Sequence, residues 1–168
     1  MDLYLVRHAI AEEHHPARWP DDSQRTLTPK GIARFRRAAR GLQRLVPEVD
    51  VMLSSPYPRA WQTAEVLHIE AGWPAPQNCP ELEAVRSPTG VLHVLEAHRA
   101  HSSAAFVGHE PFLSRLASLL LCGDEGAVSL ELKKGGVMLL ELAARPGPGG
   151  AVLRWSVSPK ILRSLDCG

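Results

Sequence analysis

Short apolar runs alternate with segments of helical periodicity along the first part of this 168-residue chain. The runs at 3–6, 51–53 and 104–107 have the length and composition of strands buried on both faces. Proline and capping signals together with apolar spacing predict helices at 29–46, 58–70, 89–100 and 111–121. Because parallel strands are joined by crossover helices, this order predicts a parallel sheet with helices on both faces.

The last part of the chain follows a different pattern and predicts antiparallel strands. Residues 129–134, 137–143 and 151–157 resemble strands, and residues 146–150 between the last two are rich in Gly and Pro, as in a hairpin turn. The resulting fold class is α/β: a three-layer α/β/α sandwich with a mostly parallel central sheet and antiparallel C-terminal strands. We expect residues 1–168 to form one domain of this kind.

Charge and cysteine content exclude several functional classes. The chain has 19 Lys and Arg against 18 Asp and Glu, so it lacks the positive excess that holds nucleic acid or an anionic membrane. Cys79, Cys122 and Cys167 are widely spaced and odd in number, which indicates neither a disulfide framework nor a zinc site. No apolar run is long enough to span a bilayer. We therefore expect a cytoplasmic protein without nucleic acid or membrane partners.

Arginine and histidine residues stand where the predicted parallel strands end. Arg7 and His8 follow the first strand, Arg59 lies at the start of the helix after the second, and His109 follows the strand at 104–107. Ligands of open parallel sheets bind just beyond the carboxyl ends of the strands. The sequence therefore predicts that these two arginines and two histidines meet at one edge of the sheet.

Such a set suits phosphoryl transfer. Two guanidinium groups neutralise a phosphoryl group and donate to its oxygens in fixed directions. The helix that Pro58 opens adds backbone N–H groups and the positive end of its dipole. One imidazole can attack phosphorus in line while the second helps to hold the transferring group. This chemistry requires neither a metal nor another cofactor, and we expect none.

The motifs resemble those of a known family. They are Leu5-Val6-Arg7-His8-Ala9, the segment 54–64 (Ser-Ser-Pro-Tyr-Pro-Arg-Ala-Trp-Gln-Thr-Ala) and Val107-Gly108-His109. In this order they resemble the histidine phosphatase, or phosphoglycerate-mutase-like, superfamily. The short chain, the Arg-His-Ala form and the Gly-His-Glu-Pro run are most similar to its SixA-type phosphohistidine phosphatases. The resemblance implies that His8 is the nucleophile and that Arg7, Arg59 and His109 form the phosphate pocket.

Two positions depart from the family pattern. Many members have glycine where Ala9 stands, and alanine fits there only with a negative φ. Larger relatives supply a glutamate proton donor two residues after a leucine, a position that falls on Ala84 when counted from Leu82. Glu81 and Glu83 are the candidate replacements, with the alternative that both are solvated loop carboxylates. A missing acid favours a P–N substrate, because imidazole is a far weaker base than an alkoxide.

The resemblance implies a phosphatase that acts on protein phosphohistidine through a covalent intermediate on His8, and we expect a monomer. Two alternatives remain: an enzyme of the same superfamily that acts on small phosphomonoesters, as a phosphatase or a mutase, and a phosphate-binding module without catalysis. A cysteine-dependent phosphatase is excluded because no cysteine begins a Cys-x5-Arg motif. The open site that a short chain implies should be bordered by the polar loop 9–27.

Two further groups of residues have competing interpretations. The histidines are dense enough to suggest a metal site, although solvated loop and helix faces explain them better; they are His14, His15, His93, His98 and His101. The helix at 29–46 carries arginines opposite its apolar stripe, which either dock an acidic partner or form a solvated face; they are Arg34, Arg36, Arg37, Arg40 and Arg44.

Overall fold

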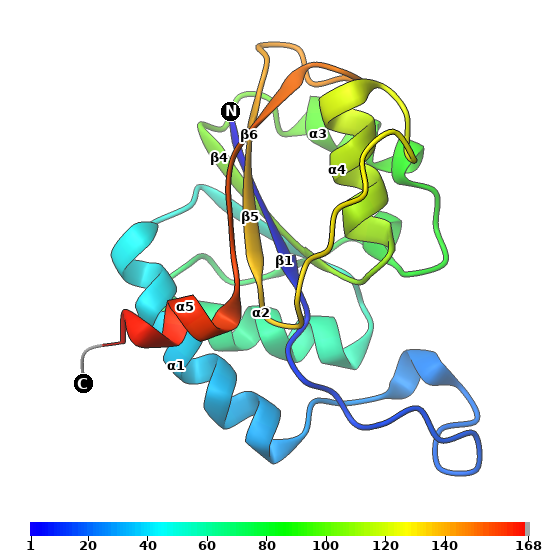
Figure 1. The fold of residues 1–168 in the computed structure, drawn as a ribbon, viewed down its shortest axis with the longest axis vertical. Coiled ribbons are helices and arrows are strands. Elements are labelled where there is room, and N and C mark those ends of the chain that lie inside the picture. The colour runs from blue at the N-terminus through cyan, green and yellow to red at the C-terminus, as the bar shows by residue number, and fades with distance from the viewer. Residues whose placement is uncertain (167–168) are drawn as a thin grey trace.

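The computed structural model describes residues 1–166, which form a six-stranded sheet with helices on both faces (Figure 1). The strands are β1 (Asp2–Arg7), β2 (Val51–Ser54), β3 (Gln77–Asn78), β4 (Ser103–Gly108), β5 (Val137–Leu142) and β6 (Ala151–Val157). The helices are α1 (Pro29–Leu45), α2 (Pro58–Ala71), α3 (Val91–Ala97), α4 (Phe112–Cys122) and α5 (Pro159–Ser164). Short 3-10 turns occupy Asp22–Gln24, Pro80–Leu82 and Pro88–Gly90.

The strand order is β3-β2-β4-β1-β5-β6, and its first four strands are parallel. β5 runs antiparallel to both of its neighbours, β1 and β6. The predicted α/β class, with a mostly parallel sheet completed by antiparallel pairing at its C-terminal side, is therefore confirmed.

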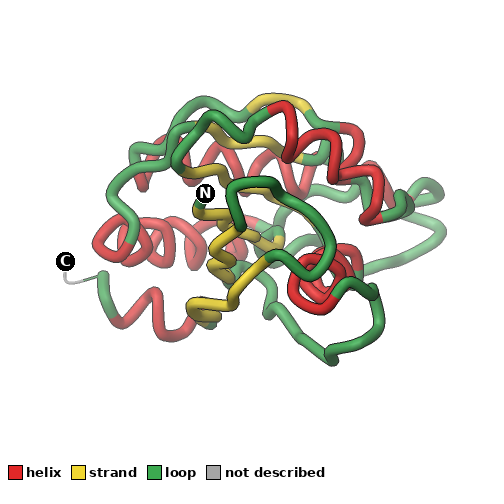
Figure 2. Tube along the Cα trace, turned by 90° about the horizontal axis from the view of Figure 1, so that it is seen from above, coloured by secondary structure: helices red, strands yellow, loops and turns green. Residues whose placement is uncertain are grey.

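Alternating side chains of the central strands separate two apolar layers. Tyr4 and Val6 of β1 face α1, α2 and α5, whereas Leu3 and Leu5 face α3 and α4. Strand residues point alternately to opposite faces, so an unbroken apolar run such as 3–6 serves both layers. Helices accordingly lie on both sides of the strands when the molecule is seen from above (Figure 2).

The helix starts follow from local capping chemistry. The Thr28 hydroxyl accepts a hydrogen bond from the Gly31 N–H at 2.9 Å, and Pro29 fits the first helical position of α1. The sequence reading missed α5, although Ser158 and Pro159 carry the same signature. Its six residues are too few to show an apolar period, so the Ser-Pro pair was the available signal.

The strand expected at 129–134 is wrong, because this segment is held by side chains at the end of the sheet. The Leu132 N–H donates to Glu110 Oε1 at 3.2 Å, and the Leu132 carbonyl accepts from the Arg7 guanidinium at 2.7 Å. Both backbone groups of Leu132 are thus satisfied without a strand partner. Gly135, at φ +77°, then turns the chain into β5.

The pairing of β1 with β4 brings the ends of two motifs together. Arg7 lies opposite Gly108, and the His8 N–H donates to the Gly108 carbonyl at 2.9 Å. Helix α1 follows β1 on one face and α4 follows β4 on the other, which opens a crevice between these strand ends.

The described cysteines are unpaired. Cys79 is buried and Cys122 is exposed, and both are free thiols, whereas Cys167 lies outside the described residues. Among residues 1–166, no helix is both long enough and apolar enough to cross a bilayer.

Candidate active site

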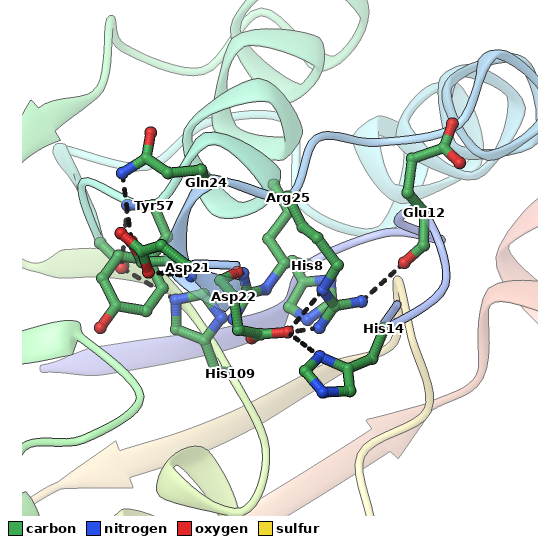
Figure 3. Close-up of polar contacts among 12 residues, drawn as sticks. His8, Glu12, His14, Asp21, Asp22, Gln24, Arg25, Tyr57 and His109 are labelled. Atoms are coloured by element: carbon green, nitrogen blue, oxygen red, sulfur yellow. Dashed lines mark hydrogen bonds and ion pairs between the residues drawn. The ribbon is translucent and has the colours of Figure 1, made fainter. Parts of the chain in front are cut away.

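A cavity of about 460 Å³ opens at the carboxyl edge of the sheet, and Arg7, His8, Arg59 and His109 all line it. The rings of His8 and His109 lie side by side, with their centroids 5.3 Å apart (Figure 3). The structure thus brings together the four residues that the motifs singled out. The loop 9–27 borders the cavity, as expected, through residues that include Glu12, His14 and Asp22.

His8 is held as a neutral imidazole in one tautomer. Its Nδ1 lies 2.7 Å from the Ala9 carbonyl oxygen, which only accepts hydrogen bonds, so Nδ1 carries the proton and Nε2 keeps the lone pair. Burial, together with the charges of Arg59, Arg7 and Lys134, lowers the pKa of His8 to about 3. Nε2 is therefore the free base and potential nucleophile of the site.

The backbone beside His8 is anchored to α2. The Ala9 N–H donates to the Thr63 hydroxyl at 3.0 Å, and that hydroxyl donates to the Arg59 carbonyl at 2.6 Å. Ala9 is accommodated because no residue other than glycine has a positive φ among residues 1–166. The connection links the end of β1 to the first turn of the helix that carries Arg59.

His109 presents a hydrogen-bond donor to the site. The Ser55 hydroxyl accepts from the Tyr57 N–H at 3.3 Å and lies 2.8 Å from His109 Nε2, to which it can donate its own proton. We therefore assign the imidazole proton of His109 to Nδ1, the ring nitrogen without a partner among residues 1–166. Burial, followed by the proximity of His8 and Arg59, lowers the pKa of His109 to about 2, so the ring is neutral.

Protein acceptors position the two arginines. Arg7 donates from one terminal nitrogen to the Leu132 carbonyl at 2.7 Å. Arg59 donates to the Asp22 carbonyl at 2.7 Å and to the Asp22 carboxylate at 3.1 Å, and it lies over the Tyr57 ring. Burial lowers the pKa of both arginines, but a guanidinium remains charged in a protein. Two fixed positive charges therefore flank the imidazoles.

Three buried N–H donors of this site have no acceptor among residues 1–166. They are Nε of Arg7, Nε of Arg59 and Nδ1 of His109. Among the buried side-chain groups of the described residues, only the Trp19 indole N–H shares this condition outside the site. A buried unsatisfied donor costs about 1–3 kcal/mol. A ligand with several anionic oxygens supplies the missing acceptors. The arrangement is that of an oxyanion site next to a nucleophilic nitrogen.

The sequence reading did not identify a second group of site residues in the loop 9–27. Asp22 Oδ1 accepts from Arg25 Nε at 2.7 Å and from His14 Nδ1 at 2.9 Å, so Asp22 lies between them (Figure 3). These hydrogen bonds, from Arg25 foremost, lower the pKa of Asp22 to about 2. Asp22 and Arg25 look like a local pair in the sequence, and nothing there indicates the contact with Arg59.

The structure does not bring the candidate proton donors to the cavity. Glu81 accepts from the Cys79 thiol at 3.3 Å and lies 3.5 Å from His93, while Glu83 pairs with Arg86 at 3.3 Å. Neither glutamate lines the cavity, whereas Ala84 does. The carboxylates that line it are Glu12, Glu13, Asp22 and Glu110. Among residues 1–166, no group of three or more His, Cys, Asp or Glu side chains could hold a metal ion.

Known proteins resemble this chain both in sequence and in structure. The family model of the histidine phosphatase superfamily (branch 1) matches residues 3–86. An uncharacterized protein of Picosynechococcus sp. is 37% identical over 146 residues, which are 86% of this chain and 87% of that protein. The structure of the protein histidine phosphatase SixA complexed with tungstate is similar with a TM-score of 0.82 and 25% identity, over 96% of this chain and 99% of that one.

A more distant likeness shows the fold alone. A mutant phosphoserine phosphatase of Entamoeba histolytica in complex with phosphoserine has a TM-score of 0.69 at 16% identity. The match covers 96% of this chain and 98% of that one. One fold therefore accommodates phosphatases whose substrates differ.

Acid should destabilise the folded chain through its two buried imidazoles. Below the ordinary histidine pKa of about 6.5, His8 and His109 bind protons in the unfolded chain. In the folded chain their lowered pKa values keep both rings unprotonated. The free energy of unfolding should therefore fall as the pH falls, by about 1.4 kcal/mol per pH unit for each ring. Urea unfolding of the wild type and of His8→Gln between about pH 6 and pH 4 should show a shallower dependence in the variant.

The matched control is His15→Gln, which replaces a ring that is exposed in the folded chain. This control should retain the wild-type pH dependence. A His8→Gln variant whose unfolding free energy follows the wild-type slope would contradict the burial of a neutral His8.

Proposed function

The chain belongs to the histidine phosphatase superfamily and to its SixA-type branch, and on this premise we propose that it removes the phosphoryl group from phosphohistidine in proteins. His8 acts as the nucleophile, and Arg7, Arg59 and His109 hold the phosphoryl group. The observation that carries this proposal is the set of three buried N–H donors without acceptors around the free Nε2 of His8.

In the first step, His8 Nε2 attacks phosphorus in line with the bond to the substrate imidazole. The new P–N bond forms as the old one breaks, and charge spreads over the three phosphoryl oxygens. Arg7, Arg59 and His109 donate to these oxygens from fixed positions, so little reorganisation accompanies the transition state. The substrate ring departs as neutral imidazole when its other nitrogen already carries a proton.

In the second step, water attacks phosphorus and the bond to His8 Nε2 breaks. Inorganic phosphate leaves, one water proton goes to solvent or to phosphate, and the lone pair returns to Nε2. The proton on Nδ1 stays hydrogen-bonded to the Ala9 carbonyl throughout, so His8 also departs as neutral imidazole. Both half-reactions therefore have an imidazole leaving group.

The carboxylates around the cavity support a P–N substrate over an alkyl phosphate. An alkoxide leaving group needs a proton in the transition state, whereas imidazole does not. Of the four carboxylates that line the cavity, Asp22 has a pKa of about 2 and stays ionised, and Glu110 is engaged by the Leu132 N–H and the Ser114 hydroxyl. Glu12 pairs with Arg18 at 3.3 Å, and Glu13 is exposed on the loop 9–27. Neither Glu81 nor Glu83 lines the cavity. Hydrolysis of small phosphomonoesters is the second candidate, favoured because exposed loop residues, Glu13 and His14, border the cavity.

When turnover of a 32P-labelled phosphohistidine protein is stopped rapidly without acid, the label should be found on His8. The His8→Ala variant should carry no label and lose at least about a thousandfold in kcat, because it lacks the nucleophile. His15→Ala is the control and should behave like the wild type. Turnover by a folded His8→Ala variant, or turnover by a wild type that never becomes labelled, would overturn the covalent mechanism. A wild type that neither turns over nor becomes labelled would favour a binding module.

A substrate panel separates the two candidate activities. The wild type should hydrolyse a phosphohistidine protein with a kcat/KM at least about a hundredfold above that for sugar and nucleotide phosphates, because the latter need an acid. Glu81→Gln and Glu83→Gln should leave the phosphohistidine rate unchanged. Equal kcat/KM values for phosphohistidine and alkyl phosphates would contradict the P–N assignment.

A further inference from the structure

A second cavity, of about 260 Å³, adjoins the active site on the side of α1 and α5. Ala9, the residue after the nucleophile, lines it, and Lys134 lines both cavities. Figure 1 shows α1 and α5 next to each other, near the end of β1. The apolar part of its lining includes Ala9, Phe35 and Pro159, of which Ala9 and Phe35 are buried. A ligand seated in this cavity would lie directly beside the catalytic residues.

The charged lining of this second cavity has one sign. Its cationic residues are Arg34, Lys133, Lys134, Lys160 and Arg163, and no acidic residue lines it. Lys133 pairs with Glu131 at 2.6 Å, but the other four form no ion pair within residues 1–166. Burial, followed by the charges of Arg34 and Arg37, lowers the pKa of Arg163. Positive charge is therefore concentrated at this point of an almost neutral chain.

Other arginines of α1, unlike Arg34, are paired with carboxylates of the protein. Arg36 lies 3.5 Å from Glu70, and Arg37 lies 3.4 Å from Asp166. Arg40 reaches both of these carboxylates, at 2.9 Å and 3.0 Å. This part of the arginine-rich face is thus neutralised by the protein itself, whereas Arg34 faces the second cavity without a carboxylate beside it. Of these four arginines, Arg34 is the one placed to bind an acidic partner.

We propose that the second cavity binds an acidic segment of the phosphoprotein substrate, while the phosphorylated side chain of the same protein enters the active site. This inference rests on the proposed function. Carboxylates of the segment pair with Arg34, Lys160 and Arg163, and one of its apolar side chains packs on Ile10 and Pro159, the partly exposed apolar residues of the lining. Such binding, remote from the reacting atoms, raises kcat/KM for the protein substrate.

The lining favours a peptide segment over a small inorganic anion. The cations come from three separate parts of the chain, namely α1, residues 133–134 and α5, and they surround apolar side chains. An inorganic anion would contact the charges but leave the partly exposed side chains of Ile10 and Pro159 uncovered. A peptide offers carboxylates and an apolar side chain together, on a backbone that can continue across Lys134 into the active site.

Two phosphohistidine peptides that differ only in their flanks, with Glu-Leu-Glu in one and Gln-Leu-Gln in the other, test this proposal. At low salt the wild type should hydrolyse the acidic peptide with a kcat/KM roughly tenfold higher than that of the neutral peptide. Each exposed charge pair contributes little to binding, but several pairs act together. Combining Arg34→Glu with Lys160→Glu should reduce that ratio to about one or below. The control, Arg99→Glu with Arg145→Glu, reverses two exposed cations at the opposite edge of the sheet and should keep the wild-type ratio.

Two further measurements separate the failure of this inference from the failure of the proposed function. Hydrolysis of p-nitrophenyl phosphate should be equal in all three proteins, because neither pair of substitutions lies in the catalytic cavity. Fluorescence anisotropy with the unphosphorylated acidic peptide reports binding even if phosphohistidine is not a substrate. A wild type without preference for the acidic peptide, or a preference that survives Arg34→Glu with Lys160→Glu, would overturn the inference. Saturable binding of tripolyphosphate without binding of the acidic peptide would also overturn it, in favour of a small-anion site.

Discussion

The parallel pairing of β1 with β4 is the constraint on which the site depends. It sets Arg7 opposite Gly108 and closes with the hydrogen bond from the His8 N–H to the Gly108 carbonyl. Both strands therefore end at the same level, and their next residues, His8 and His109, lie side by side. A shift of one residue in this register would send one of the two rings to the opposite face of the sheet. The packing of residues 3–6 opposes such a shift, because it would exchange Tyr4 and Val6 of one apolar layer with Leu3 and Leu5 of the other.

Burial at these strand ends gives the imidazoles and guanidiniums their chemical properties. It keeps both rings neutral, so that His8 retains a lone pair on Nε2 and His109 offers a proton on Nδ1. It also leaves three N–H donors without acceptors among residues 1–166, at about 1–3 kcal/mol each. Binding of a phosphoryl group would recover this free energy. The unpaired donors thus lower the stability of the free folded chain and raise its affinity for the phosphoryl group.

Sequence reasoning located the four central residues because their positions follow from strand order and strand ends, which apolar patterns reveal. It could not locate Asp22, because the contact with Arg59 spans 37 residues and comes from an irregular loop. It wrongly predicted a strand at 129–134, because apolar and polar residues alternate there. In the structure, Arg7 and Glu110 hold Leu132 in place of a neighbouring strand. Glu81 and Glu83 stayed ambiguous for a similar reason. Nothing in a loop sequence tells which way a carboxylate points, and contacts with Cys79 and Arg86 decided it.

The central claim is that the unpaired donors around His8 bind a tetrahedral oxyanion. The most direct measurement is 15N-correlated NMR of the arginine Nε–H and histidine N–H groups during titration with tungstate, the ion found with SixA. Resonances of Arg7 Nε, Arg59 Nε and His109 Nδ1 should shift together and saturate, while those of exposed Arg99 and Arg145 stay unchanged. Tungstate that fails to bind, or that binds without moving these three resonances, would contradict the account.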